Sequence, residues 1–246
     1  MKVELINHTR NAIETLLYTK NTRLQGACSF QDIVEWPDEK KQEHLDYMRD
    51  TIQSSWEFVD YTFHITGVTR AFTHQFVRTR QGSYAQQSQR TVDVRDQEVI
   101  GPDNEVYRWT AQACKESYAT LIDQGMDVQD ARGILPTNMT TEIIAKFDLR
   151  TLHNMALVRL CTRTQGEYQN VFRAMVDAVI AVHPWAKDFI KAQCAWNGVC
   201  AFPRYTECPV QRFTHKAPDS TLAQIQDELD ACGHVANPIA KDGVTM

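Results

Sequence analysis

The stretch Phe58-Val-Asp-Tyr-Thr-Phe-His-Ile-Thr66 decides the fold, because apolar and polar side chains alternate along it. A period of two places successive side chains on opposite faces of a strand. We therefore expect a half-buried strand over residues 58–66. Its buried face carries Val59, Tyr61, Phe63 and Ile65.

Helical spacing replaces this alternation after Gly67, where we expect the strand to break. The apolar residues that follow recur three or four positions apart, as on one face of a helix. Such a helix brings Gln75 and Arg78 to the start of a loop. Its apolar face consists of Val68, Ala71, Phe72 and Phe76.

Further helices are predicted on both sides of this unit, so the fold class is α+β. Residues 38–52 and 105–124 have helical spacing. Asp127 is a suitable N-cap for a short helix that contains Arg132 and ends at Pro136. Another helix is expected near residues 221–231, with disorder after it. The buried side of the helix over 105–124 is predicted to be Val106, Trp109, Ala113, Leu121 and Ile122.

Residues 140–160 are predicted to form a capped helix that starts at Thr140 or Thr141. At about 100° per residue, Asp148 and Arg159 share one face, roughly 16 Å apart along the axis. Arg150 and Asn154 share nearly the opposite face. Two polar faces indicate two sets of ligands or partners, and an amphipathic surface helix is the alternative.

Length and composition predict a single domain over residues 1–215 and a C-terminal tail over residues 216–246, partly helical or disordered. The 246 residues are 43% hydrophobic, which is enough to bury a core, and the formal net charge is -5. No apolar run reaches membrane-spanning length, and the first residues lack the regions of a signal peptide. We therefore expect a cytoplasmic protein with no membrane partner.

The cysteines do not predict a disulfide framework, because seven is an odd number. Cys194, Cys200 and Cys208 form a cluster with spacings of six and eight, whereas Cys161 is isolated. These spacings lack the paired C-x2-C of many zinc sites. We expect reduced structural thiols and no metal site.

Residues 78–90, here called the arginine loop, read Arg78-Thr-Arg-Gln-Gly-Ser-Tyr-Ala-Gln-Gln-Ser-Gln-Arg90, with three arginines and no acidic residue. Guanidinium groups keep their charge and match phosphate oxygens in pairs, and Ser hydroxyls complete such sites. A local positive charge in an acidic chain favours a small phosphorylated ligand over nucleic acid. A solvated basic surface is the alternative.

The spacing of Arg78, Arg80 and Ser88 resembles the R-H-R-x7-S motif of the flavin-dependent thymidylate synthases, often called ThyX. Thr79 stands where that family usually has His. Residues 61–77 resemble the segment before the motif, and residues 131–136 and 140–168 resemble the second half of the family's domain. The resemblance covers about residues 40–185.

The resemblance implies a single α+β domain, with a central and largely antiparallel sheet flanked by long helices. It implies a homotetramer whose active sites are shared between subunits. The implied reaction is the reductive methylation of dUMP to dTMP, with FAD as cofactor and methylenetetrahydrofolate and NADPH as co-substrates.

The resemblance also assigns residues to ligands. Arg159 and Ser88 are the catalytic candidates, since the family's arginine promotes ionisation at the N3 edge of the pyrimidine and its serine takes part in holding the phosphate. The implied dUMP set is Gln75, Arg78, Gln86, Gln87, Ser88, Gln89, Arg90, Arg132 and Arg159. The implied FAD set is Ser54, Arg78, Thr79, Arg80, Gln86, Asp148, Leu149, Arg150 and Asn154.

Four positions depart from the family pattern. Thr79 and Ile52 replace histidines, Ala85 replaces a frequent Asn, and Asp148 replaces Asn. A threonine cannot titrate near neutral pH. These changes leave open a relative that methylates or hydroxymethylates another pyrimidine nucleotide, dCMP or UMP. They also leave open a catalytically inactive homologue that only binds flavin or nucleotide.

Overall fold

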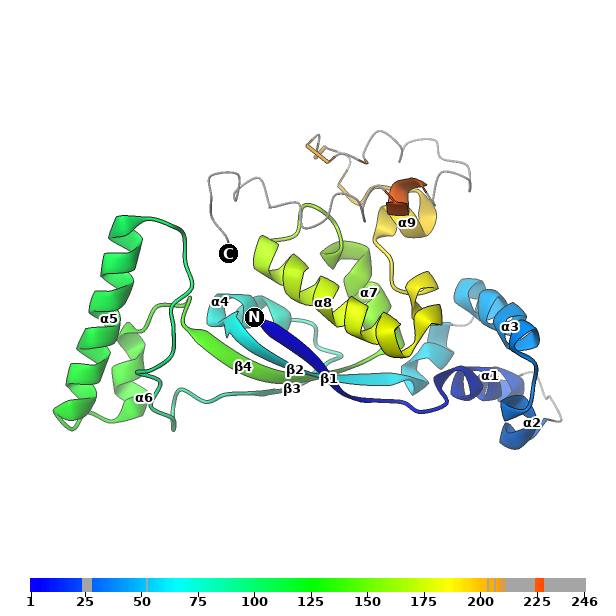
Figure 1. The fold of residues 1–246 in the computed structure, drawn as a ribbon, viewed down its shortest axis with the longest axis horizontal. Coiled ribbons are helices and arrows are strands. Elements are labelled where there is room, and N and C mark those ends of the chain that lie inside the picture. Colours follow the sequence, from blue (N-terminus) through cyan, green and yellow to red (C-terminus); the bar gives the residue numbers. More distant parts are fainter. Residues whose placement is uncertain are drawn as a thin grey trace.

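The computed structural model describes residues 1–23, 28–51, 53–202, 204–205, 207–208, 210 and 224–227. Its centre is an antiparallel sheet in the order β1-β2-β4-β3 (Figure 1). Together with the surrounding helices, this sheet confirms the predicted α+β class. The strands are β1 (Lys2–His8), β2 (Asp60–Thr69), β3 (Ser83–Gln86) and β4 (Thr140–Asp148).

Helices lie over one face of the sheet and beyond both of its ends (Figure 1). On the covered face are α4 (Arg70–Phe76), α7 (Leu149–Arg159) and α8 (Gly166–Val182). One end carries α1 (Ala12–Arg23), α2 (Phe30–Val34), α3 (Asp38–Thr51) and the 3-10 helix η1 (Gln53–Phe58). The other end carries α5 (Glu105–Asp123), α6 (Val128–Ala131) and η2 (Arg132–Ile134), whereas η3 (Pro184–Asp188) and α9 (Gln193–Asn197) follow α8.

The alternation in residues 58–66 does form β2, whose Tyr61, Phe63 and Ile65 are fully buried. The predicted break at Gly67 is wrong, because the strand continues to Thr69. Gly67 has a φ of +66°, and the pairing with β4 shifts register between Thr66 and Val68. A bulge absorbs one extra residue where glycine tolerates this backbone conformation.

The predicted helix over residues 140–160 is also wrong in its first half, which forms β4. Thr141, Ile143, Ala145 and Phe147 are buried while the residues between them are exposed. This period of two is that of a strand, and β4 is held between two partners, β2 and β3. Only α7, the second half of the segment, is helical.

The bounds of α3 and α5 agree with the sequence, whereas the helix expected from Val68 begins at Arg70 because Val68 belongs to β2. On α5, Val106 and Trp109 are 70% and 72% exposed, contrary to the prediction. The predicted Leu121 and Ile122 do pack, against a small buried cluster that includes Tyr118.

Asp127 caps α6 as expected, its side chain accepting from the Gln129 N–H. Residues 224–227 are helical and fall within the helix predicted near 221–231, whereas most of the predicted tail and Ile52 lie outside the described residues. Within the described ranges, no helix combines the length and the apolar composition needed to cross a membrane.

Aromatic rings join the sheet to its helices. Phe76 of α4 is fully buried and contacts the rings of Phe72, Tyr84, Phe147 and Tyr168 at centroid distances between 4.9 and 5.8 Å. These five rings come from α4, β3, β4 and α8. They fix the end of α4, and therefore the start of the arginine loop, against the sheet.

Replacing Phe76 with Ala is expected to lower the free energy of unfolding by about 3–5 kcal/mol, because a buried ring is lost and a cavity remains. Phe58→Ala is the control, since Phe58 is 60% exposed, and its cost should stay within about 0.5 kcal/mol. Denaturant titration followed by circular dichroism measures both. Equal losses would contradict the role given to the ring cluster.

Candidate functional site

The arginine loop begins with a tight turn that extends the end of α4. The N–H of Arg78 donates to the Gln75 carbonyl oxygen at 3.2 Å, and the N–H of Thr79 donates to that of Phe76 at 3.2 Å. The Gly82 N–H then donates to the Thr79 carbonyl oxygen at 3.1 Å. A Cβ on Gly82 would lie 2.4 Å from the Phe147 ring, so this turn requires glycine.

The side chain of Tyr84 fixes the turn through hydrogen bonds to its backbone. Its hydroxyl lies 2.7 Å from the carbonyl oxygen of Thr79 and 3.1 Å from that of Phe76, and it donates to both. Burial raises the pKa of Tyr84, so the hydroxyl keeps its proton and remains a donor. The backbone that carries Arg78 and Arg80 is therefore tied to β3.

The start of α4 is fixed by a buried carboxylate. Thr69 is the N-cap, and its hydroxyl oxygen accepts from the Phe72 N–H at 3.0 Å. Glu167 at the start of α8 accepts from the Thr69 N–H at 2.7 Å and from the Thr69 hydroxyl at 2.6 Å. Two donors satisfy the carboxylate, as its burial requires.

The pairing of β3 with β4 brings the turn close to the start of α7. Ser83 lies opposite Lys146, so Arg80 and Gly82 are at the sheet end where Asp148 follows. Asp148 is not inside a helix, as the sequence had indicated, but is the N-cap of α7. One carboxylate oxygen accepts from the Thr151 N–H at 2.6 Å.

Its role as the N-cap of α7 explains how Asp148 can replace the family's usual Asn. Asp and Asn cap helices about equally well, so Asp148 performs the same local function as the family's usual residue. Leu149, in contrast, is fully buried and its N–H donates to the Val59 carbonyl oxygen, so it supports the site from the core. Arg150 pairs with Glu57 of η1, whereas Asn154 is exposed and Ser54 of η1 is half-buried.

A second group of polar residues gathers at the opposite end of β3. The Gln86 amide donates to the Thr73 hydroxyl at 2.9 Å, and the Gln87 carbonyl accepts from Arg70 at 3.3 Å. Burial lowers the pKa of Arg70, and the cation of Arg132 lowers it further, so these two arginines lie close together.

Ser88 and Arg90 continue this group beyond β3. The Ser88 hydroxyl oxygen accepts from the Arg90 N–H at 3.1 Å, which leaves the hydroxyl proton available to a ligand. Both side chains are exposed, whereas Gln89 is half-buried.

Arg159 reaches the turn from the end of α7. Its guanidinium lies 4.1 Å from the centre of the Tyr168 ring, in cation–π contact. Tyr168 is buried against Phe72 and Phe76, and both Arg159 and Thr79 oppose the rise that burial causes in its pKa. Thr79 and Arg159, eighty residues apart in sequence, therefore meet at one tyrosine.

Near the end of α4, the Gln75 amide donates to the Gln165 side chain at 3.2 Å. The two groups of site residues thus sit at the two ends of β3, a separation of roughly 10 Å for a strand of this length. Gln75, Arg78, Thr79, Arg80, Asp148 and Arg159 lie at one end, and Gln86, Gln87, Arg70 and Arg132 lie at the other.

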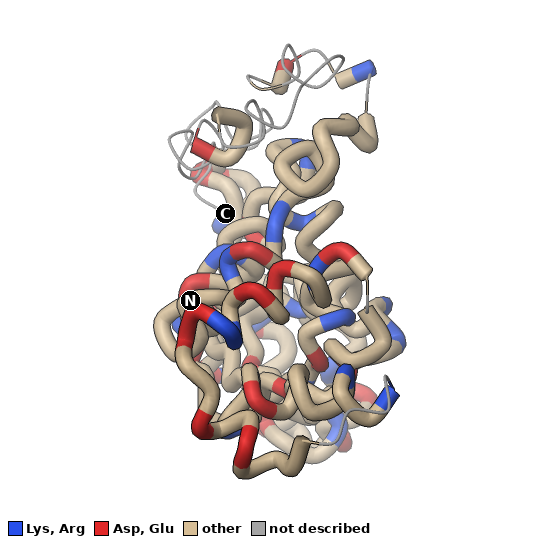
Figure 2. Tube along the Cα trace, turned by 90° about the vertical axis from the view of Figure 1, so that its right-hand side faces the viewer, with Lys and Arg blue, Asp and Glu red and all other residues tan. Residues whose placement is uncertain are grey.

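The exposed arginines of these groups are not neutralised by the chain. In the described ranges, Arg78, Arg80, Arg90 and Arg132 form no ion pair. Acidic and basic residues are otherwise interspersed over the trace (Figure 2). A concentration of unpaired guanidinium groups in an acidic protein is suited to binding an anionic ligand.

Three residues that build the site were not predicted from the sequence as site residues. Glu167 makes its contacts with Thr69, 98 residues away in the chain. The hydrogen bonds of Tyr84 and the cation–π contact of Tyr168 join residues much nearer in sequence. A tyrosine directly after Gly-Ser gives no local sign that its hydroxyl closes a turn. Arg70 lies outside the arginine loop, and its contact with Gln87 adds it to the site.

The chain is similar to known proteins over most of its length. Residues 4–185 match the model of the family described as thymidylate synthase complementing protein, Thy1. The chain belongs to this family. A flavin-dependent thymidylate synthase of Pyrococcus furiosus is 30% identical over 219 residues, which cover 81% of this chain and 89% of that protein. One of Sulfurisphaera tokodaii is 28% identical over 207 residues, which cover 79% of each chain.

The crystal structure of a flavin-dependent thymidylate synthase has a similar fold. Helicobacter pylori ThyX, solved in complex with FAD and dUMP, superposes with a TM-score of 0.65 at 21% identity, over 78% of this chain and all of that one. At this identity the likeness concerns the fold. The resemblance inferred from the arginine loop is confirmed at the level of the family.

Tyr84→Phe is expected to lower the free energy of unfolding by about 1–2 kcal/mol, because two carbonyl oxygens lose their shared donor. Hydrogen exchange should rise at residues 78–83, which the hydroxyl holds. Tyr47→Phe is the matched control, since Tyr47 is 50% exposed. Unchanged exchange in the turn would show that Tyr84 does not hold it.

Proposed function

We propose that this protein is a flavin-dependent thymidylate synthase that converts dUMP to dTMP. Membership of the Thy1 family and the names of its relatives support this activity. The observation that carries it is the meeting of Arg159 with the turn of Arg78 and Thr79 across Tyr168. That geometry supports the proposal that Arg159 activates the pyrimidine ring beside a loop that binds its phosphate.

The proposed substrate site binds both the charged phosphate and the other polar groups of dUMP. Ser88, Arg90 and Arg132 take the phosphate, because the two guanidinium groups have no ion pair among the described residues and the hydroxyl has a free proton. Gln75 and Arg78 complete the binding from the other end of β3. The remaining members of the set are Gln86, Gln87, Gln89 and Arg159.

Arg159 is the proposed catalytic residue. An arginine stays cationic at neutral pH, so it stabilises negative charge that develops on the pyrimidine ring. Its contact with the Tyr168 ring orients the guanidinium before substrate arrives. Such pre-organisation avoids a reorganisation cost during the reaction.

The residues present fit a flavin with a diphosphate. Arg78 and Arg80 are exposed and unpaired within the described ranges, and they lie at the end of the sheet where α7 begins. FAD, when bound, supplies the reducing equivalents, with NADPH and methylenetetrahydrofolate as co-substrates. Thr79, Gln86, Arg150, Asn154 and Ser54 are the other proposed contacts, and Asp148 and Leu149 hold the start of α7 in place.

We also propose that the active protein is a homotetramer with shared sites. The face of the sheet opposite α7 and α8 exposes Ile144 together with Glu142 and Lys146. A subunit that packed there would bring a second chain to the outer face of β4, near both groups of site residues. The cytoplasm remains the proposed location.

The function is tested by the absorption spectrum of the purified protein and by anaerobic NADPH oxidation with dUMP, dCMP or UMP. Flavin bands that bleach fastest with dUMP are expected. A faster response to dCMP or UMP would replace the substrate, and bleaching with none of them would indicate an inactive homologue. A protein that takes up no FAD would overturn the proposal.

Arg159→Ala is expected to lower turnover by about 10²- to 10³-fold while FAD remains bound, because charge on the ring is no longer stabilised. Arg49→Ala, which removes a cation paired with acidic neighbours on α3, should retain normal turnover. Steady-state kinetics and the flavin content of each variant measure the two effects. Near-normal activity of Arg159→Ala would refute the assigned role.

Ser88→Ala is expected to weaken dUMP binding by about 1–3 kcal/mol, roughly 5- to 150-fold in Kd, because a phosphate contact is lost. The control is Ser83→Ala, an exposed serine at the start of β3. Calorimetric titration with dUMP gives both constants. If the two variants bind equally well, the phosphate does not contact Ser88.

A further inference from the structure

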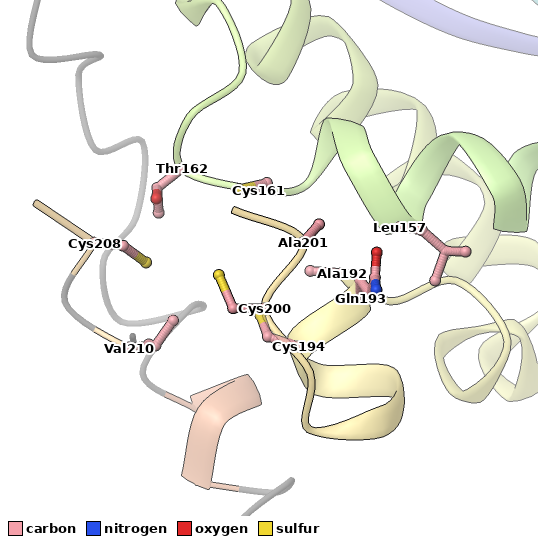
Figure 3. A pocket seen from close by; sticks show the side chains of 10 residues that line it. All are labelled: Leu157, Cys161, Thr162, Ala192, Gln193, Cys194, Cys200, Ala201, Cys208 and Val210. Atoms are coloured by element: carbon pink, nitrogen blue, oxygen red, sulfur yellow. The ribbon is translucent and has the colours of Figure 1, made fainter. Parts of the chain in front are cut away.

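Four cysteines from separate parts of the chain line one small cavity. Cys161 follows the end of α7, Cys194 lies in α9, and Cys200 and Cys208 follow α9. The cavity volume is about 20 Å³. Figure 3 shows the side chains of Cys200 and Cys208 pointing into the space between the loop of Cys161 and α9. The sequence left Cys161 isolated, and the fold adds it to the cluster.

The four thiols are electrostatic neighbours. Burial raises the pKa of Cys194 to about 12, with smaller contributions from the neighbouring Cys161, Cys208 and Cys200. Burial also raises the pKa of Cys161, with smaller contributions from Cys208 and Cys200. All four are free thiols.

Backbone donors point at these sulfur atoms. The Phe202 N–H donates to Cys200 Sγ at 3.3 Å. The N–H groups of Arg163 and Ala195 are hydrogen-bonded to the sulfurs of Cys161 and Cys194. Such donors stabilise negative sulfur, and hydrogen bonds of this kind surround metal-bound thiolates.

A small apolar cluster of described residues lies beside the cysteines. It consists of Ala192, Ala195, Val210 and Ile225, and Cys194 and Cys208 pack against it. A metal bound here would stabilise this part of the fold, because the free energy of binding a structural metal adds to the free energy of folding.

We propose that Cys161, Cys194, Cys200 and Cys208 bind one structural Zn²⁺ ion as four thiolates. Zinc accepts four sulfur ligands in a tetrahedral arrangement at about 2.3 Å. A cavity of about 20 Å³ holds one water-sized group, so it suits a single ion better than an iron–sulfur cluster. Each thiol gives its proton to solvent on binding, which leaves the site with two negative charges beside the Arg163 cation.

Binding of a metal requires the cysteine side chains to turn toward one another. Among the residues that the structure describes, no three His, Cys, Asp or Glu side chains already stand in a metal-binding arrangement. The four cysteines line the same cavity, and rotation about χ1 is the movement available to each side chain. This site is independent of the proposed function, and either can fail without the other.

Metal analysis of the full chain, purified without chelator, tests the site. Inductively coupled plasma mass spectrometry is expected to find about one Zn²⁺ per chain. Cys200→Ser and Cys208→Ser should lower this content about tenfold or more. Cys28→Ser and Cys114→Ser, which change free thiols outside the cavity, should keep it.

Two measurements keep the test decisive if a variant fails to fold. Wild-type protein loaded with Co²⁺ should show thiolate-to-cobalt charge transfer, and a zinc chelator should lower its Tm by on the order of 5 °C, reversibly with added Zn²⁺. Wild-type protein that takes up no zinc would overturn the proposal. Iron with acid-labile sulfide in place of zinc, or zinc retained by both cavity variants, would overturn it as well.

Discussion

The antiparallel pairing of β2 with β4 is the constraint on which the rest of the structure depends. Thr69 lies opposite Thr140 and Asp60 lies opposite Asp148, so the two strands end at opposite edges of the paired region. Each strand passes directly into a helix through a capping side chain, Thr69 for α4 and Asp148 for α7. The two helices therefore start far apart on the same face of the sheet. Their ends approach each other, which brings Arg159 to the turn after α4.

The two N-caps not only permit this geometry but also stabilise it. A helix start leaves backbone N–H groups without partners, and a side-chain oxygen at the N-cap satisfies one of them. At α4 the cap is itself held by Glu167, a buried carboxylate whose two oxygens both accept hydrogen bonds from Thr69. This links the first turn of α4 to the first turn of α8. Tyr168, the next residue, supplies the ring that the Arg159 guanidinium contacts. Two neighbouring residues therefore fix both the start of α4 and the position of the Arg159 side chain.

Local pattern was enough to predict β2 and the composition of the arginine loop, but not the contacts between distant segments. The alternation around Phe63 is strict, and it does not depend on any partner for its recognition. Residues 140–148 end at Asp148, the N-cap of a helix, so the sequence there resembles the start of a longer helix. The segment is recognised as a strand only through its pairing with β2 and β3. The same limit applies to Cys161, because a thiol that joins three others from separate segments is defined by tertiary structure alone.

The unpaired arginines show how such a fold is coupled to its ligand. Arg132 lies close enough to Arg70 for its cation to lower the pKa of Arg70, and Arg78, Arg80 and Arg90 have no ion pair in the described ranges. Like charges held together weaken the folded state, and an anion bound between them removes that repulsion. A ligand that binds only the folded chain stabilises it in proportion to the logarithm of its concentration. The rigid parts of the site, namely the capped helices and the ring cluster, therefore keep the guanidinium groups in place before the ligand arrives.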